Sequence, residues 1–219
     1  MRTPRKQHTG LLIAFEGGEG VGKSTQITLL SGWLKQKGLP FLVTRQPGGT
    51  PMGRSLRRLL LSPKSGRVGS RAELLLYEAD RAHHVESVIL PALQSGKVVI
   101  SDRFTDSSTV YQGICRGLGK EWTEKLNGFA TNSLAPDLVI LIDLPVSEGR
   151  KRISSRGELD KMELEKLEFH QKVRAGFLSL ARKSPKRFLI LNGKQPKQTI
   201  AQIIQNALEK RLRKQGLLK

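Results

Sequence analysis

A glycine-rich loop near the N-terminus carries the clearest chemical signal in this chain. Residues 17–24 read GGEGVGKS and match the pattern G-x-x-x-x-G-K-[ST]. Glycines let such a loop turn tightly with its N–H groups inward, and the following helix adds the positive end of its dipole, so phosphate oxygens bind there. Lys23 presents a positive charge to the β and γ phosphates, and the Ser24 hydroxyl suits the bridging Mg²⁺ ion. The loop predicts an ATP site with Mg²⁺ as cofactor, formed by Gly17, Gly18, Glu19, Gly20, Val21, Gly22, Lys23, Ser24 and Thr25.

Arginines in other segments are suited to a second anion. Arg45 lies in TRQPGGT, Arg81 ends YEADR, and Arg103 lies in SDRF. Open α/β folds bind ligands at the carboxyl edge of the sheet, so we expect Arg45 and Arg103 to face the P-loop across an acceptor phosphate. Asp102 is placed to organise Mg²⁺ or its waters, with a helix cap as the alternative. An ATP loop facing a second phosphate site indicates phosphoryl transfer.

The elements that must position these residues follow from the apolar pattern. Short β-rich runs alternate with segments of helical periodicity. The runs cover residues 11–16, 41–44, 97–102, 138–143 and 187–191. The helical segments cover 23–37, 52–61, 71–93, 121–133, 147–156, 160–183 and 197–214. This alternation predicts an α/β protein with a three-layer α/β/α P-loop NTPase fold, a central five-stranded parallel sheet and a helical lid.

Finer features of the sequence predict where the elements lie. The runs at 98–100 and 138–142 are almost entirely aliphatic, which is typical of central strands. Pro91 is expected to kink or end the third helix, and the prolines and glycines of 47–53 predict an irregular loop. The length of 219 residues predicts a single domain, 1–219, with residues 1–10 as a flexible basic lead-in.

Composition excludes several classes of protein. Cys115 is the single cysteine, so one subunit forms no disulfide and no cysteine-based zinc cluster, which fits the cytoplasm. No apolar run approaches the ~20 residues that a membrane span needs. The net charge of +19 favours polyanionic partners, but the lysines and arginines are spread along the chain and no nucleic-acid motif accompanies them. Nucleotides are therefore the preferred anions, and a nucleic-acid-stimulated ATPase stays open as an alternative.

The order of these motifs resembles the thymidylate kinase family, over nearly the whole chain. The matching segments are Glu16-Gly17, Arg45 to Thr50, Tyr77 with Arg81, Asp102-Arg103, Tyr111-Gln112 and, as a lid of the bacterial type, Arg156 to Asp160. The resemblance implies phosphorylation of dTMP to dTDP with ATP and Mg²⁺, in the synthesis of dTTP, by a homodimer. A P-loop kinase for another nucleoside monophosphate or a small alcohol is the nearest alternative.

The resemblance also implies a role for each residue of the acceptor site. Tyr77 would stack on thymine and Arg81 would donate to a base carbonyl, where an ordinary core aromatic and a surface ion pair are the alternatives. Glu19 would accept a hydrogen bond from the sugar 3′-hydroxyl. Residues of the next segment would surround the base and sugar, namely Ser107, Ser108, Tyr111 and Gln112.

The catalytic arginine of this family lies either in the P-loop or in the lid. This P-loop has no arginine, so the resemblance implies the lid type, with residues 147–162 as the lid. Arg156 is preferred, Arg152 is second and Arg150 is a further candidate, and the catalytic set is Lys23, Asp102, Arg103 and Arg156. Gln46 departs from the glutamate common in the family block, which is expected to loosen local contacts. His83 and His84 point to different helix faces, which indicates a structural role.

Overall fold

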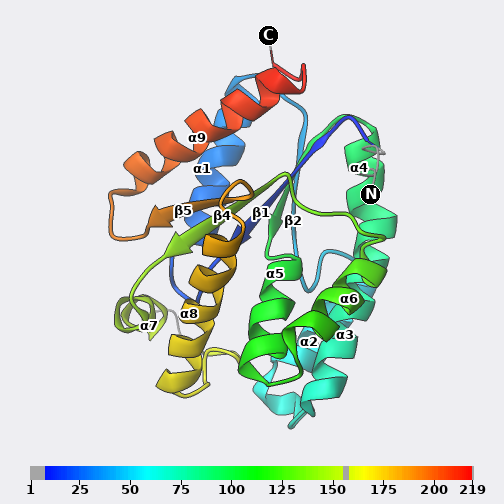
Figure 1. The fold of residues 1–219 in the computed structure, drawn as a ribbon, viewed down its shortest axis with the longest axis vertical. Coiled ribbons are helices and arrows are strands. Elements are labelled where there is room, and N and C mark those ends of the chain that lie inside the picture. The colour runs from blue at the N-terminus through cyan, green and yellow to red at the C-terminus, as the bar shows by residue number, and fades with distance from the viewer. Residues whose placement is uncertain (1–7, 155–157, 219) are drawn as a thin grey trace.

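The chain folds into three layers, with helices on both faces of one parallel sheet (Figure 1). This computed structural model describes residues 8–154 and 158–218. Most of the predicted lead-in, residues 1–7, lies outside the described residues. None of the helices within the described ranges is long and apolar enough to cross a membrane.

The sheet has five strands in the order β2-β3-β1-β4-β5, and every neighbouring pair is parallel. The strands are β1 (Leu11–Glu16), β2 (Phe41–Arg45), β3 (Val98–Asp102), β4 (Leu138–Asp143) and β5 (Phe188–Asn192). They coincide with the predicted runs to within a residue at each end. β3 and β4 flank β1, so the prediction that the two aliphatic runs are central is confirmed. A parallel sheet also brings the ends of β1, β2 and β3 to one edge, where the P-loop, Arg45 and Arg103 lie.

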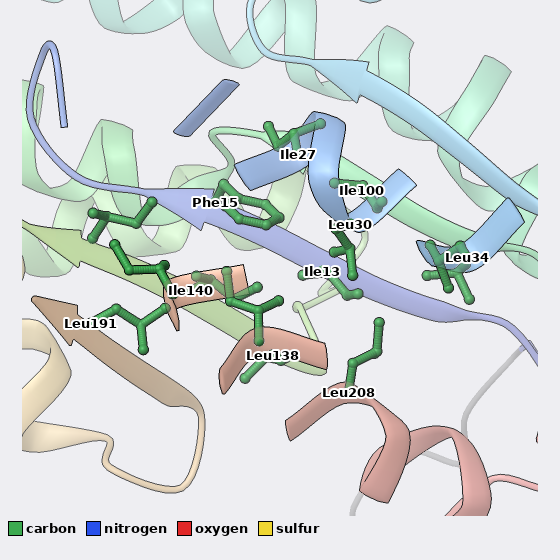
Figure 2. Close-up of a cluster of buried hydrophobic side chains, with 14 of the residues drawn as sticks. Ile13, Phe15, Ile27, Leu30, Leu34, Ile100, Leu138, Ile140, Leu191 and Leu208 are labelled. Carbon is green, nitrogen blue, oxygen red and sulfur yellow. The ribbon is translucent and has the colours of Figure 1, made fainter. Parts of the chain in front are cut away.

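Each face of the sheet has its own apolar core. On one face, Ile13 and Phe15 of β1 pack against α1 (Lys23–Gln36) and α9 (Lys197–Lys214), and Figure 2 labels Leu30 of α1 and Leu208 of α9 within this cluster. On the other face, Leu12 and Ala14 pack against α8 (Leu167–Lys183) and the helices that follow β3. Because β1 is packed on both faces, its end, where the P-loop begins, has a fixed position.

The third predicted helix, 71–93, is continuous but not uniform. It runs as α3 (Ser70–His84), a π-helical segment (Val85–Ile89) and α4 (Leu90–Gln94). Pro91 has no N–H to donate, and the widened turn before it is closed by the N–H of Leu90 bonding to the carbonyl of Val85. The helix ends at Gln94, shortly after Pro91, as predicted.

Two segments differ from the sequence prediction. Residues 105–115 were not predicted to be helical, but they form α5 (Thr105–Ser108) and a π-helical segment (Thr109–Cys115). The predicted helix 160–183 is wrong at its start, because α8 begins only at Leu167. There Asp160 Oδ1 accepts hydrogen bonds from the backbone N–H groups of Met162 and Glu163, and the segment turns instead of continuing as helix. The remaining helices are α2 (Pro51–Leu61), a 3₁₀ turn (Pro63–Ser65), α6 (Lys120–Ala130) and α7 (Val146–Ser154).

Candidate active site

The P-loop connects β1 to α1 and is shaped by glycines with positive φ. Gly17, Gly20 and Gly22 have φ of 133°, 68° and 104°. A Cβ at Gly20 would lie 2.2 Å from the carbonyl oxygen of Gly149, so this position also requires glycine for space. Lys23 curls back over the loop, and its Nζ donates to the carbonyls of Gly17 at 3.2 Å and Gly18 at 2.7 Å. No side chain caps the start of α1 and its first turn has no acidic residue, so the positive helix end faces the loop.

A polar cavity of about 220 Å³, which we call the P-loop pocket, opens above this loop. It brings seven of the nine predicted ATP-binding residues, Glu19 to Thr25, together with Arg45 at the end of β2 and Arg103 after β3, whereas Gly17 and Gly18 line a neighbouring cavity. Its described walls are Glu19 to Thr25, Arg45, Gln46, Arg57, Asp102, Arg103, Asp160 and Glu163. The predicted convergence of Arg45 and Arg103 on the P-loop is thus seen in the structure.

Arg103 is held in place by both its backbone and its side chain. Its φ is 69°, a left-handed conformation that side chains rarely adopt, and its N–H donates to the carbonyl of Phe15 at 3.0 Å. Its guanidinium donates to the Gly17 carbonyl at 3.0 Å, to Ser107 Oγ at 3.2 Å and to Glu19 Oε1 at 2.5 Å. The side chain therefore lies directly between the P-loop and the next helix.

Glu16 fixes the turn that carries Arg103. Its Oε1 accepts the N–H groups of Phe104 at 2.8 Å and Ser107 at 3.2 Å, and its Oε2 accepts the Ser107 hydroxyl at 2.6 Å. Burial and the nearby Asp106 carboxylate raise the pKa of Glu16 to about 7, against the opposing effects of Arg103 and these hydrogen bonds. The sequence marked Glu16 as part of a motif but did not predict this positioning role.

Glu19 faces away from the P-loop backbone and toward a second cavity. Its Oε1 accepts the Tyr111 hydroxyl at 3.1 Å as well as Arg103. Burial alone would raise the pKa of Glu19, but Arg103, Lys23 and the Tyr111 hydrogen bond together lower it to about 2. Glu19 is therefore ionised at neutral pH and acts only as a hydrogen-bond acceptor.

The second cavity, of about 80 Å³, lies beside the first, and we call it the inner pocket. All six predicted base-site residues line it: Tyr77, Arg81, Ser107, Ser108, Tyr111 and Gln112. Tyr77 is half-buried, and burial raises the pKa of its phenol, so the ring stays neutral. The other described residues that line the inner pocket are Glu19, Gln46, Pro47, Arg57, Leu61, Arg103, Asp160 and Met162.

Arg81 is buried and donates hydrogen bonds to several neighbouring residues, so it is not a surface residue. Only 2% of it is exposed, and it donates to Gln46 Oε1 at 3.0 Å, Glu78 Oε1 at 2.5 Å and Ser108 Oγ at 2.9 Å. Its Nη2 donates to the Phe104 carbonyl at 3.2 Å. An Nη2 group carries two hydrogens, so a further donor remains for a ligand in the inner pocket.

His84 anchors the irregular loop that follows β2. Its ring nitrogens lie 2.7 Å from Thr44 Oγ1 and 3.2 Å from Gln46 Nε2, and it is fully buried. Gln46 also accepts a hydrogen bond from Arg81, so its amide contacts both Arg81 and His84. The structural role expected for His84 agrees with these contacts.

The oxygens of Asp102 and Ser24 fit the predicted Mg²⁺. Both residues line the P-loop pocket, and Asp102 Oδ1 is buried without a hydrogen-bond partner. A buried carboxylate oxygen without a partner is costly unless a cation or donor occupies the site. Among the described residues, no three His, Cys, Asp or Glu side chains form a metal cage.

The structure does not bring the described lid arginines to these pockets. Arg156, the preferred candidate, lies outside the described residues. The Arg152 guanidinium donates to the carbonyl of Gly193 at 3.2 Å, and Arg150 lines a separate apolar cavity beneath the P-loop, beside His170. Neither lines the P-loop pocket or the inner pocket.

Several wall residues were not predicted from the sequence. Arg57 lines both pockets and donates to the Pro47 carbonyl at 3.0 Å. It is one of three arginines in α2, and the sequence offers no means to choose among them. Asp160 lines both pockets, Met162 the inner one and Glu163 the P-loop pocket. The lid motif contained Asp160, but only the tertiary path places it beside the substrates.

Comparison with known proteins identifies the family. A thymidylate kinase family profile matches residues 15–204. The thymidylate kinase of Carboxydothermus hydrogenoformans is 48% identical over 200 residues, covering 91% of this chain and 97% of that protein. The thymidylate kinase of Desulfovibrio desulfuricans is 46% identical over 213 residues, covering 94% and 98%. The crystal structure of thymidylate kinase from Ehrlichia chaffeensis has a TM-score of 0.75 at 30% identity and covers 91% of this chain and 98% of that chain. With motifs, fold and relatives in agreement, this chain belongs to the thymidylate kinase family.

Proposed function

We propose that this chain transfers the terminal phosphoryl group of ATP to dTMP, giving ADP and dTDP, as a step in dTTP synthesis. One observation carries the proposal: the P-loop pocket and the inner pocket share a wall, formed by Glu19, Gln46, Arg57, Arg103 and Asp160. A nucleoside bound in the inner pocket would therefore place its phosphate at this wall, next to the donor phosphate in the P-loop pocket. Family membership supports dTMP as the acceptor.

On the donor side, the P-loop holds the triphosphate. Backbone N–H groups of residues 17–22 and the Lys23 ammonium bind the phosphate oxygens. Ser24 and Asp102 would hold Mg²⁺, which when bound would neutralise phosphate charge. Lys23 and the P-loop thus fix the donor for in-line attack.

On the acceptor side, arginines overcome the repulsion between the two phosphates. Arg103 and Arg45 hold the acceptor phosphate, with Arg57 beside them in the same pocket. An oxygen of a monophosphate is already an anionic nucleophile, so positioning and charge neutralisation suffice without a general base. The placement of these arginines decides how closely the phosphates approach.

The inner pocket suits a nucleoside. Tyr77 offers an aromatic face for the base, and Arg81 offers the remaining Nη2 hydrogen to a base carbonyl. Ser107, Ser108, Tyr111 and Gln112 surround the base and sugar, and the ionised Glu19 accepts from the 3′-hydroxyl. The lid, with Arg156 preferred and Arg152 second, closes over ATP and excludes water.

We further propose a cytoplasmic homodimer. Adjacent helices α3 and α6 expose large apolar side chains, with Leu75 59%, Trp122 58% and Phe129 87% exposed. Large apolar side chains exposed on neighbouring helices commonly mark a protein interface. The single cysteine, Cys115, fits a reducing compartment.

An acceptor panel tests the proposed reaction. ADP release is measured with ATP, Mg²⁺ and each nucleoside monophosphate in turn, with shikimate as a small alcohol. We expect dTMP to give the highest kcat/KM. Turnover of CMP or GMP without turnover of dTMP would contradict the proposal, and so would ADP release that depends only on added nucleic acid.

A further inference from the structure

Residues 160–166, which we call the strap, run from the end of the predicted lid to α8, beside the inner pocket. Asp160 and Met162 of the strap line that pocket. One side of the strap is attached to the end of α2, where the Lys161 N–H donates to the Leu61 carbonyl at 2.9 Å and Lys161 Nζ donates to the Leu59 carbonyl at 3.2 Å. The strap therefore forms one wall of the pocket that we assign to the acceptor.

On its other side, the strap contacts the core through the buried Met162 and contacts Arg116. Its Nη2 lies 2.6 Å from Glu165 Oε1 and 3.9 Å from Met162 Sδ. The guanidinium also lies 4.7 Å from the centre of the Phe169 ring, at the start of α8. A single arginine thus contacts the middle of the strap, its end and the helix that follows.

Arg116 is equally attached to the pocket wall. Its backbone N–H donates to the carbonyl of Tyr111 at 3.0 Å. Its Nε and Nη2 each lie 3.4 Å from Glu73, whose Oε1 accepts Gln112 Nε2 at 2.8 Å. Tyr111 and Gln112 both line the inner pocket, so Arg116 joins the strap to the residues that face the acceptor.

Little apolar packing secures the outer side of the strap. Leu164 is 58% exposed, and a groove of about 690 Å³ separates the strap from the start of α3. Arg116, Glu73 and Glu165 line that groove, so water reaches the polar contacts. Met162 in the middle of the strap is buried in the core, so these polar contacts chiefly fix the end of the strap at residues 164–166.

We propose that Arg116 is a positioning residue whose ion pair with Glu165 latches the strap over the acceptor. The proposal rests on the proposed function, because it takes the inner pocket as the dTMP site. With the latch made, Asp160 and Met162 close the pocket and exclude water from the transferring phosphate. With the latch broken, the strap opens more often and the acceptor dissociates more readily.

The substitution Glu165→Gln tests the latch, because Glu165 lines neither the P-loop pocket nor the inner pocket and its side chain is paired with Arg116. Glu168→Gln is the matched control, since Glu168 is exposed on the first turn of α8. We expect Glu165→Gln to raise KM for dTMP roughly three- to tenfold, with KM for ATP changed less than about twofold. Amide hydrogen exchange of residues 160–166 should be faster in Glu165→Gln and unchanged in the control.

A double-substitution cycle separates the latch from general destabilisation. Arg116→Gln with Glu165→Gln should raise KM for dTMP no further than Arg116→Gln alone, because both changes break one interaction. The proposal is overturned if Glu165→Gln matches Glu168→Gln in KM and in exchange, or if the effects of the two substitutions multiply. If the wild type does not phosphorylate dTMP, the proposed function fails. The exchange experiment needs no substrate and still tests the latch.

Discussion

Arg103 occupies a backbone conformation that favours glycine, in the middle of the wall shared by the two pockets. A non-glycine residue in this region costs about 1–3 kcal/mol, and it persists only where the surroundings fix it. Here Glu16 holds the next residues and the Phe15 carbonyl holds Arg103 itself. The strain is consistent with a residue retained for its guanidinium.

Two substitutions of Arg103 separate its chemical role from its backbone cost. Arg103→Ala and Arg103→Gly should each lower kcat by about 10³, because both remove the same guanidinium. Arg103→Gly should be more stable than Arg103→Ala by about 1 kcal/mol, because φ is positive. Steady-state kinetics and urea unfolding measure the two effects. Equal stability of the variants, or wild-type kcat in either, would contradict this account.

Asp102 gives a prediction about metal dependence. Asp102→Asn keeps the shape of the side chain but removes the charge beside the unpartnered Oδ1. The Mg²⁺ concentration for half-maximal activity should rise about tenfold, with partial recovery of kcat at high Mg²⁺. A Mg²⁺ titration at saturating ATP and dTMP measures this change. An unaltered Mg²⁺ requirement would show that Asp102 is only structural.

Residue types and spacing predicted much of the site at this scale. The P-loop was predictable because its chemistry needs glycines, Lys23 and Ser24 in a fixed local order. Arg45 and Arg103 were predictable because parallel strands end at one edge. Arg57 was not, because its role depends on which face of α2 turns toward the Pro47 loop. Glu16 was recognised only as a motif residue, because its partners lie 88 and 91 positions away.

At the scale of elements, the helix α3 positions the loop after β2 through His84. Gln46 Nε2 can only donate, so His84 Nδ1 must accept and the ring is neutral in this arrangement. Burial, helped by Arg81 and His83, lowers the pKa of His84 to about 4. A Cβ at Gly49 would lie 2.2 Å from His84 Nε2, which shows how closely the loop packs on this ring.

The lowered pKa of His84 predicts a pH-dependent stability. The unfolded chain, with a His pKa of 6.5, binds more protons than the folded one between pH 6.5 and about 4. The contribution of His84 is therefore complete above pH 6.5 and is lost as the pH falls toward 4. Glu16 acts oppositely, because its raised pKa makes the folded state bind more protons between pH 4.5 and about 7.

The effect of His84 is isolated by comparing the unfolding free energy of the wild type with that of His84→Gln. Both proteins contain Glu16, so its contribution to the pH dependence cancels in the difference. Urea unfolding at pH 7.5 and pH 4.5 should show the advantage of the wild type over His84→Gln shrinking by about 2 kcal/mol at the lower pH. If the difference in unfolding free energy between the wild type and His84→Gln is the same at both pH values, His84 keeps its ordinary pKa.

Elements with strong periodicity were predicted well, whereas those stabilised by tertiary contacts were not. All five strands follow apolar runs and were predicted. The segment 105–115 is rich in Ser and Thr, which have weak helix propensity, and its helical form depends on Glu16 and on Asn127 of α6, which contacts Thr105 and Thr109. The start of α8 was predicted too early because tertiary and local contacts prevent helix there. Asp160 accepts a hydrogen bond from the Met162 N–H, and Glu165 forms an ion pair with Arg116.

At the scale of the whole molecule, the apolar face of α3 and α6 predicts the oligomeric state. Phe129→Asp places a charge at a side chain that is 87% exposed, the highest value among the large apolar side chains in the described ranges, where a dimer would bury it. Light scattering after size exclusion should show a dimer for the wild type and a shift to monomer for the variant. Gln198→Asp, an exposed change on α9, should leave the dimer intact. A wild-type monomer, or a dimer that tolerates Phe129→Asp, would place the interface elsewhere or remove it.

The central claim is that the shared wall brings a donor and an acceptor phosphate together. The most direct test is transfer of ³²P from [γ-³²P]ATP, with separation of labelled dTDP from labelled phosphate. The account predicts that label appears in dTDP when dTMP and Mg²⁺ are present, and that the dTDP yield collapses in Arg103→Ala. Label released only as inorganic phosphate, or label in dTDP that is unaffected by loss of Arg103, would contradict it.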